Sequence, residues 1–323
     1  MNKLNSLWLI SLPVILMACG GGGDLNSDNA PAASTEDPLA QYQWHLGNTG
    51  QDAFSTTRPT AGIDLNVSPA WASGITGKGV IVNVVDTGLE IAHPDLAANV
   101  STGNSVNFDP NGKFGDPTNS AEAGDHGTSV AGLIAMVGNN GIGGKGVAYN
   151  AKLIGHNFLA FPTARNISQA FGGNSSDSAS KAHIFNASYG RYKCKFDGSS
   201  DENTAYANVK SLRGGKGGLI VKSAGNGFGN SEFCNDKLVP EISNGNAAFD
   251  QANVVDNVIV VAAVNANGKK SSYSTTGANI WVSGIGGEYG LNASTLGINL
   301  NNVDANLVAS EPHFQPAMIT TDQ

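Results

Sequence analysis

The chain has 323 residues, of which 14% are charged, and its formal net charge is −8. This length is enough for one globular domain of fair size with a tail. The acidic balance argues against binding to nucleic acid, because the phosphates would repel the protein. The sequence has no internal repeat and no heptad pattern, so we expect neither a repeat array nor a coiled coil.

Residues 1–19 have the pattern of an export signal. The apolar run from Leu7 to Ala18 is shorter than the roughly twenty residues that a membrane-spanning helix needs. Leu16-Met17-Ala18-Cys19 resembles a bacterial lipobox, in which the cysteine is acylated and becomes the mature N-terminus. A signal peptidase site near Ala18 is the alternative. Because Gly20 rather than Asp follows, we expect a lipid anchor in the outer membrane of a Gram-negative cell, with secretion as the alternative.

Residues 20–36 consist of Gly, Ser, Asn, Asp, Ala and Pro with little else. Such a stretch cannot bury apolar surface, so it predicts a disordered tether. If Cys19 carries lipid, Cys194 and Cys234 remain as an even pair in an exported chain, where disulfides are permitted. We therefore expect a bridge between Cys194 and Cys234, with two buried free thiols as the alternative.

From residue 37 onward, short apolar runs alternate with segments of helical pattern. Strands are expected at 79–86, 151–158, 182–189, 218–223 and 257–264, and helices at 67–73, 126–137 and 201–212, the last with Asp201 as its N-cap. This alternation predicts an α/β fold built on a doubly wound parallel sheet.

Three polar residues lie at strand ends or at a helix start, where ligands would bind. Asp86 ends an apolar run, and a charge there is costly unless it has a partner. His126 stands in the first turn of a helix after Asp125, a plausible N-cap, and Asn226 follows the strand at 218–223. Ligands in open α/β sheets bind outside the carboxyl ends of the strands, so the three residues form a candidate site. Taken singly, each has a structural alternative, such as a solvated carboxylate in a turn.

Three segments resemble the signature segments of the subtilase family, in that family's order: Asp86-Thr87-Gly88, His126-Gly127-Thr128 and Ser223-Ala224-Gly225-Asn226. The closer similarity is to the kexin and furin branch, through Gln43-Trp44-His45-Leu46, 67–76, 89–96, 138–151 and Ile319-Thr320-Thr321-Asp322. The resemblance covers roughly residues 37–323, with a poor match between Gly284 and Pro316. It implies a three-layer subtilisin-like sheet, with 37–323 as a catalytic domain that lacks its C-terminal part.

The resemblance implies a serine endopeptidase that hydrolyses peptide bonds with an Asp-His-Ser triad. Asp86 would fix the tautomer of His126 and stabilise the imidazolium that forms. Asn226 would donate its side-chain amide to the oxyanion. The backbone of Ser188, Tyr189 and Gly190 would bind an extended protein or peptide substrate as an added strand, and a plain strand ending is the alternative.

The nucleophile is the point at which this sequence departs from the family. In the family the serine lies in a Gly-Thr-Ser at a helix start, soon after the Thr-Thr-Asp segment. The Gly127-Thr128-Ser129 of this chain directly follows His126 and is not followed by a proline, so Ser129 is not assigned as the nucleophile. The chain as given is expected to stop short of the reactive serine and to be inactive alone. The alternative function is a non-catalytic surface lipoprotein that uses the fold as a binding scaffold.

The resemblance further implies a calcium site, for which oxygen ligands are suitable. Asp37 and Asp95 match its two carboxylates, and Asn140 matches its side-chain amide. Val137, Ile142 and Gly144 match its backbone carbonyl donors. A turn without metal is the alternative, and Glu232 is the one candidate for a second site.

Two further expectations concern specificity and partners. A preference for basic residues before the cut would need acids in the pocket, for which Asp197, Glu232 and Asp236 are candidates unless they are simply solvated. Little room remains between Cys19 and Asp37 for a folded pro-domain, so either a separate protein assists folding or this branch does without one. We expect a dedicated folding chaperone, as some bacterial kexin-like proteases have.

Overall fold

The computed structural model describes residues 36–119, 124–191, 196–228, 246–290 and 315–322. The expected signal peptide, most of the expected tether, Cys19, Cys194, Cys234, Glu232 and Asp236 lie outside these ranges, as does most of the poorly matched stretch 284–316.

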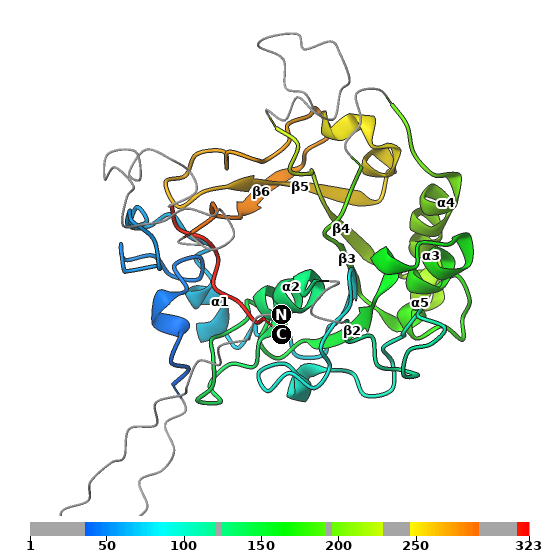
Figure 1. The fold of residues 1–323 in the computed structure, drawn as a ribbon, viewed down its shortest axis with the longest axis horizontal. Coiled ribbons are helices and arrows are strands. Elements are labelled where there is room, and N and C mark those ends of the chain that lie inside the picture. The colour runs from blue at the N-terminus through cyan, green and yellow to red at the C-terminus, as the bar shows by residue number, and fades with distance from the viewer. Residues whose placement is uncertain (1–35, 120–123, 192–195, 229–245, 291–314, 323) are drawn as a thin grey trace, which may run out of the picture. The chain divides into compact units, whose positions relative to one another are not determined.

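The described residues form a six-stranded parallel sheet with the strand order β2-β1-β3-β4-β5-β6 (Figure 1). The strands are β1 (Ile81–Val85), β2 (Lys152–His156), β3 (Ile184–Ala187), β4 (Leu219–Ser223), β5 (Val258–Val264) and β6 (Val282–Ile285). In the central register, Val82 pairs with Leu153 of β2 and with Ile184 of β3. The expected α/β fold with a parallel sheet is confirmed.

Helices cover both faces of this sheet, which gives three layers. The α-helices are α1 (Ser68–Ala72), α2 (His126–Ala135), α3 (Ala164–Ala170), α4 (Ser200–Asn208) and α5 (Leu212–Gly215). The 3-10 turns are Ala40–Tyr42, Ala97–Asn99, Phe158–Ala160, Ser178–Lys181, Val209–Ser211, Ala247–Phe249 and Gln251–Val254. On one face, α2 packs Ala131 and Ala135 with Val82 and Val84 of β1. On the other face, α3 and α4 contribute to the larger core cluster, which includes Phe185 of β3. Alternate residues of a strand point to opposite faces, so one apolar run serves both cores.

Asn83 is the polar residue within the otherwise apolar strand β1, and both ends of its amide are used. It is fully buried, and its Nδ2 donates to the carbonyl of Ala170 at the end of α3 (2.7 Å). Its Oδ1 lies 2.8 Å from Nδ1 of His156, at the end of β2. The amide therefore joins β1 to β2 and to α3, and both of its polar atoms have a partner, which is what burial of a polar group requires.

Several local expectations were wrong in detail. Asp201 is not the cap of α4, because Ser199 takes that place and its hydroxyl accepts from the amide of Glu202. Asp125 precedes α2, but its carboxylate makes no capping hydrogen bond. Helix α3 and strand β6 were not expected from the sequence. In the described ranges, we find no helix with both the length and the apolar character needed to span a bilayer.

Candidate active site

Asp86 and His126 lie in contact at the carboxyl ends of the central strands. Asp86 directly follows β1 and is fully buried, while His126 opens α2. Oδ1 of Asp86 is 2.7 Å from Nδ1 of His126 and also accepts from the backbone amide of Thr87 (2.7 Å). The structure therefore brings together the carboxylate and the imidazole that the sequence proposed as partners.

Small residues allow this close approach. A Cβ on Gly127 would overlap the carbonyl of Gly88, so only glycine fits where α2 meets the loop after β1. The Gly127 amide, one of the unpaired donors of the first helical turn, donates to the hydroxyl of Thr87 (3.1 Å). The position of His126 over Asp86 thus follows from the Asp86-Thr87-Gly88 turn and the glycine after the histidine.

The environment of His126 favours its charged form. Its pKa is raised chiefly by the hydrogen bond to Asp86, with partial opposition from burial and further support from the charges of Asp86 and Asp125. Its side chain is 55% exposed, so the ring stays accessible. Since Nδ1 is held by Asp86, Nε2 is the nitrogen left to exchange a proton with another group.

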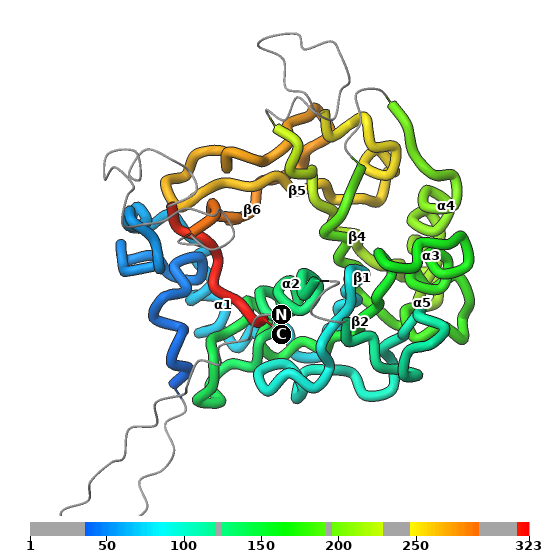
Figure 2. Tube along the Cα trace, viewed as in Figure 1, coloured from blue at the N-terminus to red at the C-terminus, as the bar shows by residue number. Residues whose placement is uncertain are grey.

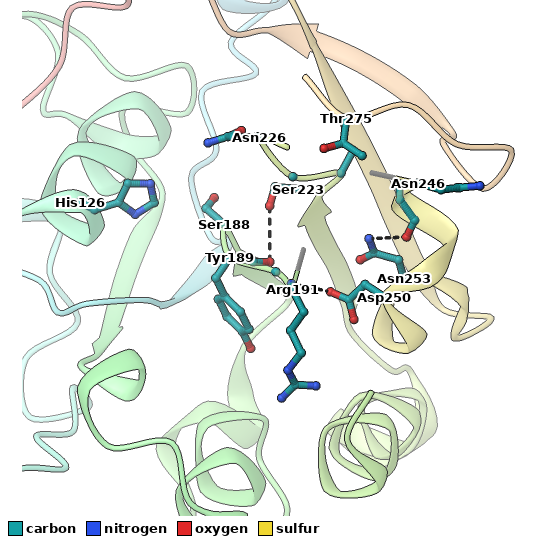
Figure 3. A pocket seen from close by; sticks show the side chains of 14 residues that line it. His126, Ser188, Tyr189, Arg191, Ser223, Asn226, Asn246, Asp250, Asn253 and Thr275 are labelled. Carbon is teal, nitrogen blue, oxygen red and sulfur yellow. Dashed lines mark hydrogen bonds between the residues drawn. The ribbon is translucent and has the colours of Figure 1, made fainter. Parts of the chain in front are cut away.

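A pocket of about 170 Å³ lies beside His126 and contains the expected substrate-binding residues (Figure 3). Its lining comprises His126, Ser188, Tyr189, Gly190, Arg191, Ser223, Ala224, Gly225, Asn226, Asn246, Ala247, Asp250, Asn253 and Thr275. Asn226 lies in the turn after β4, and its amide extends toward the side of the pocket where His126 lies (Figure 3). The structure therefore gathers His126, Asn226 and the 188–190 edge around one opening.

A buried ion pair supports this pocket, and sequence reasoning missed it. Lys222 of β4 has a fully buried side chain, and its Nζ lies 3.2 Å from Oδ2 of Asp250. The same Nζ donates to the carbonyl of Tyr189 (2.6 Å), on the expected substrate-binding edge. Asp250 Oδ2 also accepts from the amide of Arg191 (3.1 Å). A lysine inside an otherwise apolar strand was the available signal, but its partner lies 28 residues away in a loop.

The segment 315–322 runs from the neighbourhood of β6 to the start of α2, as the red tube in Figure 2 shows. Hydroxyls of Thr320 and Thr321 donate to the carbonyls of Ser129 (2.5 Å) and Thr128 (2.7 Å). In return, the Ser129 hydroxyl donates to the Thr321 carbonyl (3.0 Å). The hydroxyl of Ser129 is therefore used to join two chain segments, which agrees with its not being assigned as a nucleophile.

Asp125 has its partner in the same segment. Its pKa is raised, first by a hydrogen bond with Asp322, then by burial and by the charge of Asp322. The residue thus connects the start of α2 to the end of the described chain and does not cap the helix.

The proposed calcium ligands also come together. Asp37 and Asp95 are both buried, and the Asp37 carboxylate accepts from the amides of Asn139 (2.7 Å), Asn140 (2.9 Å) and Gly141 (3.2 Å). The amide Nδ2 of Asn140 donates to Oδ1 of Asp95 (2.7 Å), and its Oδ1 accepts from the amide of Ile142 (2.9 Å). The pKa of Asp95 is raised by burial, and repulsion from Asp37 adds to this.

The donor chemistry of this loop suits a hard cation. The two buried carboxylates repel each other, and Nζ of Lys145 lies 4.0 Å from Oδ2 of Asp37. The carbonyl oxygens of Val137, Ile142 and Gly144 accept no hydrogen bond from any described residue. A set of carboxylate and carbonyl oxygens is what calcium prefers. The residues present therefore fit this ion, although no group of three His, Cys, Asp or Glu side chains gathers in the described ranges.

Comparison with known proteins agrees with this geometry. The family model described as the subtilase family matches residues 77–312. The Aeromonas extracellular serine protease of Aeromonas sobria is 38% identical over 301 residues, which cover 88% of this chain and 43% of that protein. Neuroendocrine convertase 2 of Homo sapiens is 38% identical over 204 residues, covering 62% of this chain and 31% of that one. The chain thus spans less than half the length of these relatives.

Solved structures give the same result. The crystal structure of the serine protease of Aeromonas sobria in complex with a chaperone has a TM-score of 0.69 and 31% identity, covering 91% of this chain and 52% of that one. A protease from Pseudoalteromonas arctica has a TM-score of 0.57 and 29% identity, covering 79% of this chain and 73% of that one. On the sequence match, the fold and the relatives together, the chain belongs to the subtilase family.

Proposed function

We propose that this chain carries the acid-base half of a serine endopeptidase site that hydrolyses peptide bonds. The observation that carries the proposal is the 2.7 Å contact between buried Asp86 and accessible His126, beside a pocket that Asn226 also lines. Family membership supports peptide-bond hydrolysis as the reaction.

In the proposed mechanism, His126 acts as the base. Asp86 holds Nδ1, so Nε2 would take the proton from a hydroxyl nucleophile as that hydroxyl attacks the substrate carbonyl. The resulting imidazolium is stabilised by the neighbouring carboxylate, consistent with the raised pKa of His126. The Asn226 amide would donate to the oxyanion, and His126 would return its proton to the leaving amine.

The substrate would lie along Ser188, Tyr189 and Gly190 as an added strand. The carbonyl of Tyr189, held by Lys222, fixes one end of that edge. Among the described residues the only carboxylate lining the pocket is Asp250, which is already paired with Lys222. Asp197 does not line the pocket, so a preference for basic residues would depend on Glu232 and Asp236, which lie outside the described residues.

The nucleophile is not assigned to any residue of the 323-residue chain, and the proposal can be tested on that point. The test compares this chain with a form that continues through any coding sequence following Gln323. We expect a fluorophosphonate probe to label the continued form alone and casein hydrolysis to follow the label. His126→Ala should lower hydrolysis by about 10²–10⁴-fold, the usual contribution of a general base.

The matched control is His183→Ala, since His183 lies at the opposite ends of the strands and should leave hydrolysis unchanged. Labelling of the 323-residue chain itself would contradict the assignment. Absence of label and hydrolysis in both forms would favour the binding scaffold over the enzyme.

We also propose that Asp37, Asp95 and Asn140, with the carbonyls of residues 137, 142 and 144, bind calcium and stabilise this domain. Saturation with a ligand at 100 times its Kd stabilises a fold by about 2.7 kcal/mol, so chelation should lower the thermal midpoint clearly. Calcium should restore the midpoint, whereas magnesium should not.

Asp95→Asn should remove the dependence of the midpoint on calcium. Asp116→Asn is the matched control, because Asp116 is a half-buried carboxylate that pairs with the exposed Lys113 outside the proposed calcium ligands, so the variant should keep the dependence. Equal midpoints with and without chelator in the unmodified chain would show that no calcium binds here.

The solved relative from Aeromonas sobria forms a complex with a chaperone, which supports a dedicated chaperone as a partner for this chain too. The expected lipid on Cys19, the outer-membrane location and the bridge between Cys194 and Cys234 stay predictions from the sequence.

A further inference from the structure

A second, larger cavity lies at the other ends of the strands. It measures about 810 Å³ and is formed where the chain enters β3 and β4. Its lining comprises Gly172, Gly173, Ser175, Ser180, Lys181, His183, Asn208, Ser211, Leu212, Arg213, Gly214 and Lys216. Since all strands of the sheet are parallel, this cavity lies at the edge opposite Asp86 and His126.

The lining is basic although the chain as a whole is acidic. Lys181, His183, Arg213 and Lys216 contribute four basic side chains, whereas no Asp or Glu of the described residues lines the cavity. The formal net charge of the chain is −8, so such a one-sided lining is not explained by composition. A concave surface of one sign concentrates ligands of the opposite sign.

These cations are not neutralised by nearby acids. In the described ranges, Lys181, Arg213 and Lys216 take part in no ion pair, whereas the neighbouring Lys210 is paired with Asp256 (2.8 Å). Asp177, on the loop before Lys181, accepts instead from the backbone amide of Asn174 (2.9 Å). The positive charge of the cavity is therefore available to a ligand.

Arg213 is held in an unusual conformation. Its φ of 54° lies in the left-handed region, which a residue with a side chain seldom adopts, and Gly214 continues the same turn with φ of 69°. The side chain is only half-exposed and stands close enough to His183 that its charge, after burial, lowers the pKa of that imidazole. Strain of this kind persists where the surroundings fix a residue in place.

His183 presents a defined donor to the cavity. Its Nδ1 accepts from the backbone amide of Ile81 (3.1 Å), so in the neutral ring the proton lies on Nε2. The cavity thus combines one imidazole N–H, one guanidinium with its planar set of donors and two ammonium groups. A guanidinium matches the geometry of two phosphate oxygens, and lysines add charge to such a site.

We propose that this cavity binds a phosphate group, with Arg213 and Lys216 as its principal ligands and Lys181 and His183 as further donors. The phosphate comes either from free phosphate in solution or from a lipid headgroup. The site is independent of the endopeptidase assignment, since it shares no residue with the proposed active site.

The test is a calorimetric titration of the 323-residue chain with inorganic phosphate at constant ionic strength. We expect saturable binding at one site. The double variant Arg213→Gly and Lys216→Gln should weaken it at least tenfold. Glycine suits the left-handed backbone at 213, so this variant should fold, which an unchanged or higher thermal midpoint would verify.

Lys269→Gln is the matched control, because Lys269 is an exposed lysine outside the cavity and should leave the affinity unchanged. A second arm uses vesicles with and without phosphatidylglycerol. Loss of binding to the anionic vesicles in the double variant would identify a lipid headgroup, and phosphate binding without vesicle binding would identify free phosphate. Absence of both, or equal binding by the double variant, would overturn the proposal.

Discussion

Replacing Lys222 by methionine is expected to lower the free energy of unfolding by about 3–5 kcal/mol, the usual cost of removing one partner of a buried ion pair. The substitution leaves the carboxylate of Asp250 buried, with backbone amides and no cation. It also leaves the carbonyl of Tyr189 without its 2.6 Å ammonium donor, although the more distant Ser223 hydroxyl remains at 3.4 Å. Urea denaturation measured by circular dichroism would give the difference.

The control for this prediction is the double variant Lys222→Met and Asp250→Asn. An asparagine keeps an acceptor for the amide of Ala252, which Oδ1 of Asp250 caps at 3.2 Å, but it carries no charge. We expect it to recover a large part of the lost stability, because the cost arises from an uncompensated charge. A free energy of unfolding for Lys222→Met alone that lies within about 1 kcal/mol of the value for the unmodified chain would show that the ion pair does not stabilise the fold.

Acid is expected to destabilise the domain between pH 6.5 and about 3, through two buried histidines. Burial lowers the pKa of His45 to about 4 and that of His156 to about 3, from an ordinary value of 6.5. Below pH 6.5 the unfolded chain binds protons at these positions and the folded chain does not, so stability falls as the pH falls. At pH 5 each histidine costs about 2 kcal/mol, since one pH unit corresponds to 1.36 kcal/mol.

His183, whose pKa is lowered by burial and by the charge of Arg213, acts in the same direction as the two buried histidines. His126 has the opposite sign, and Asp116 contributes little in this window. The raised pKa of His126 stabilises the folded state at low pH and loses that effect as pH rises through it. Asp116 has a lowered pKa, so its effect appears only near and below the ordinary carboxyl value. The experiment compares urea midpoints at pH 7.5 and pH 5.0 for the unmodified chain and for His45→Gln. A variant that loses as much stability as the unmodified chain would contradict the assignment to His45.

The sequence predicted the strands and the site at their ends because both depend on local patterns. Short apolar runs such as 79–86 and 218–223 can be recognised as strands buried on both faces. In a parallel sheet all strand ends of one kind meet at one edge, so a residue that ends such a run, or follows it within a few positions, is placed by the pattern alone. Asp86 and Asn226 are of this kind, and the structure places them accordingly.

The parts that could not be predicted depend on long-range contacts. Lys222 interrupts an apolar strand, and nothing in the sequence near it indicates Asp250 as its partner. Strand β6 is four residues long and largely exposed, so its pattern is weak. Asp125 has the residue type and position of a helix cap, yet its hydrogen bond with Asp322 takes the carboxyl group elsewhere.

The clasp formed by Thr320 and Thr321 on helix α2 has a consequence for the order of events during synthesis. The residues that it joins are about 190 positions apart, and Trp44 is joined in the same way to Ala317 (2.8 Å). A nascent polypeptide emerges from its N-terminus, so neither contact can form until nearly all of these residues have been translated. The contacts that join the first turns of α2, the helix that His126 opens, to residues 320 and 321 are thus among the last to form during synthesis.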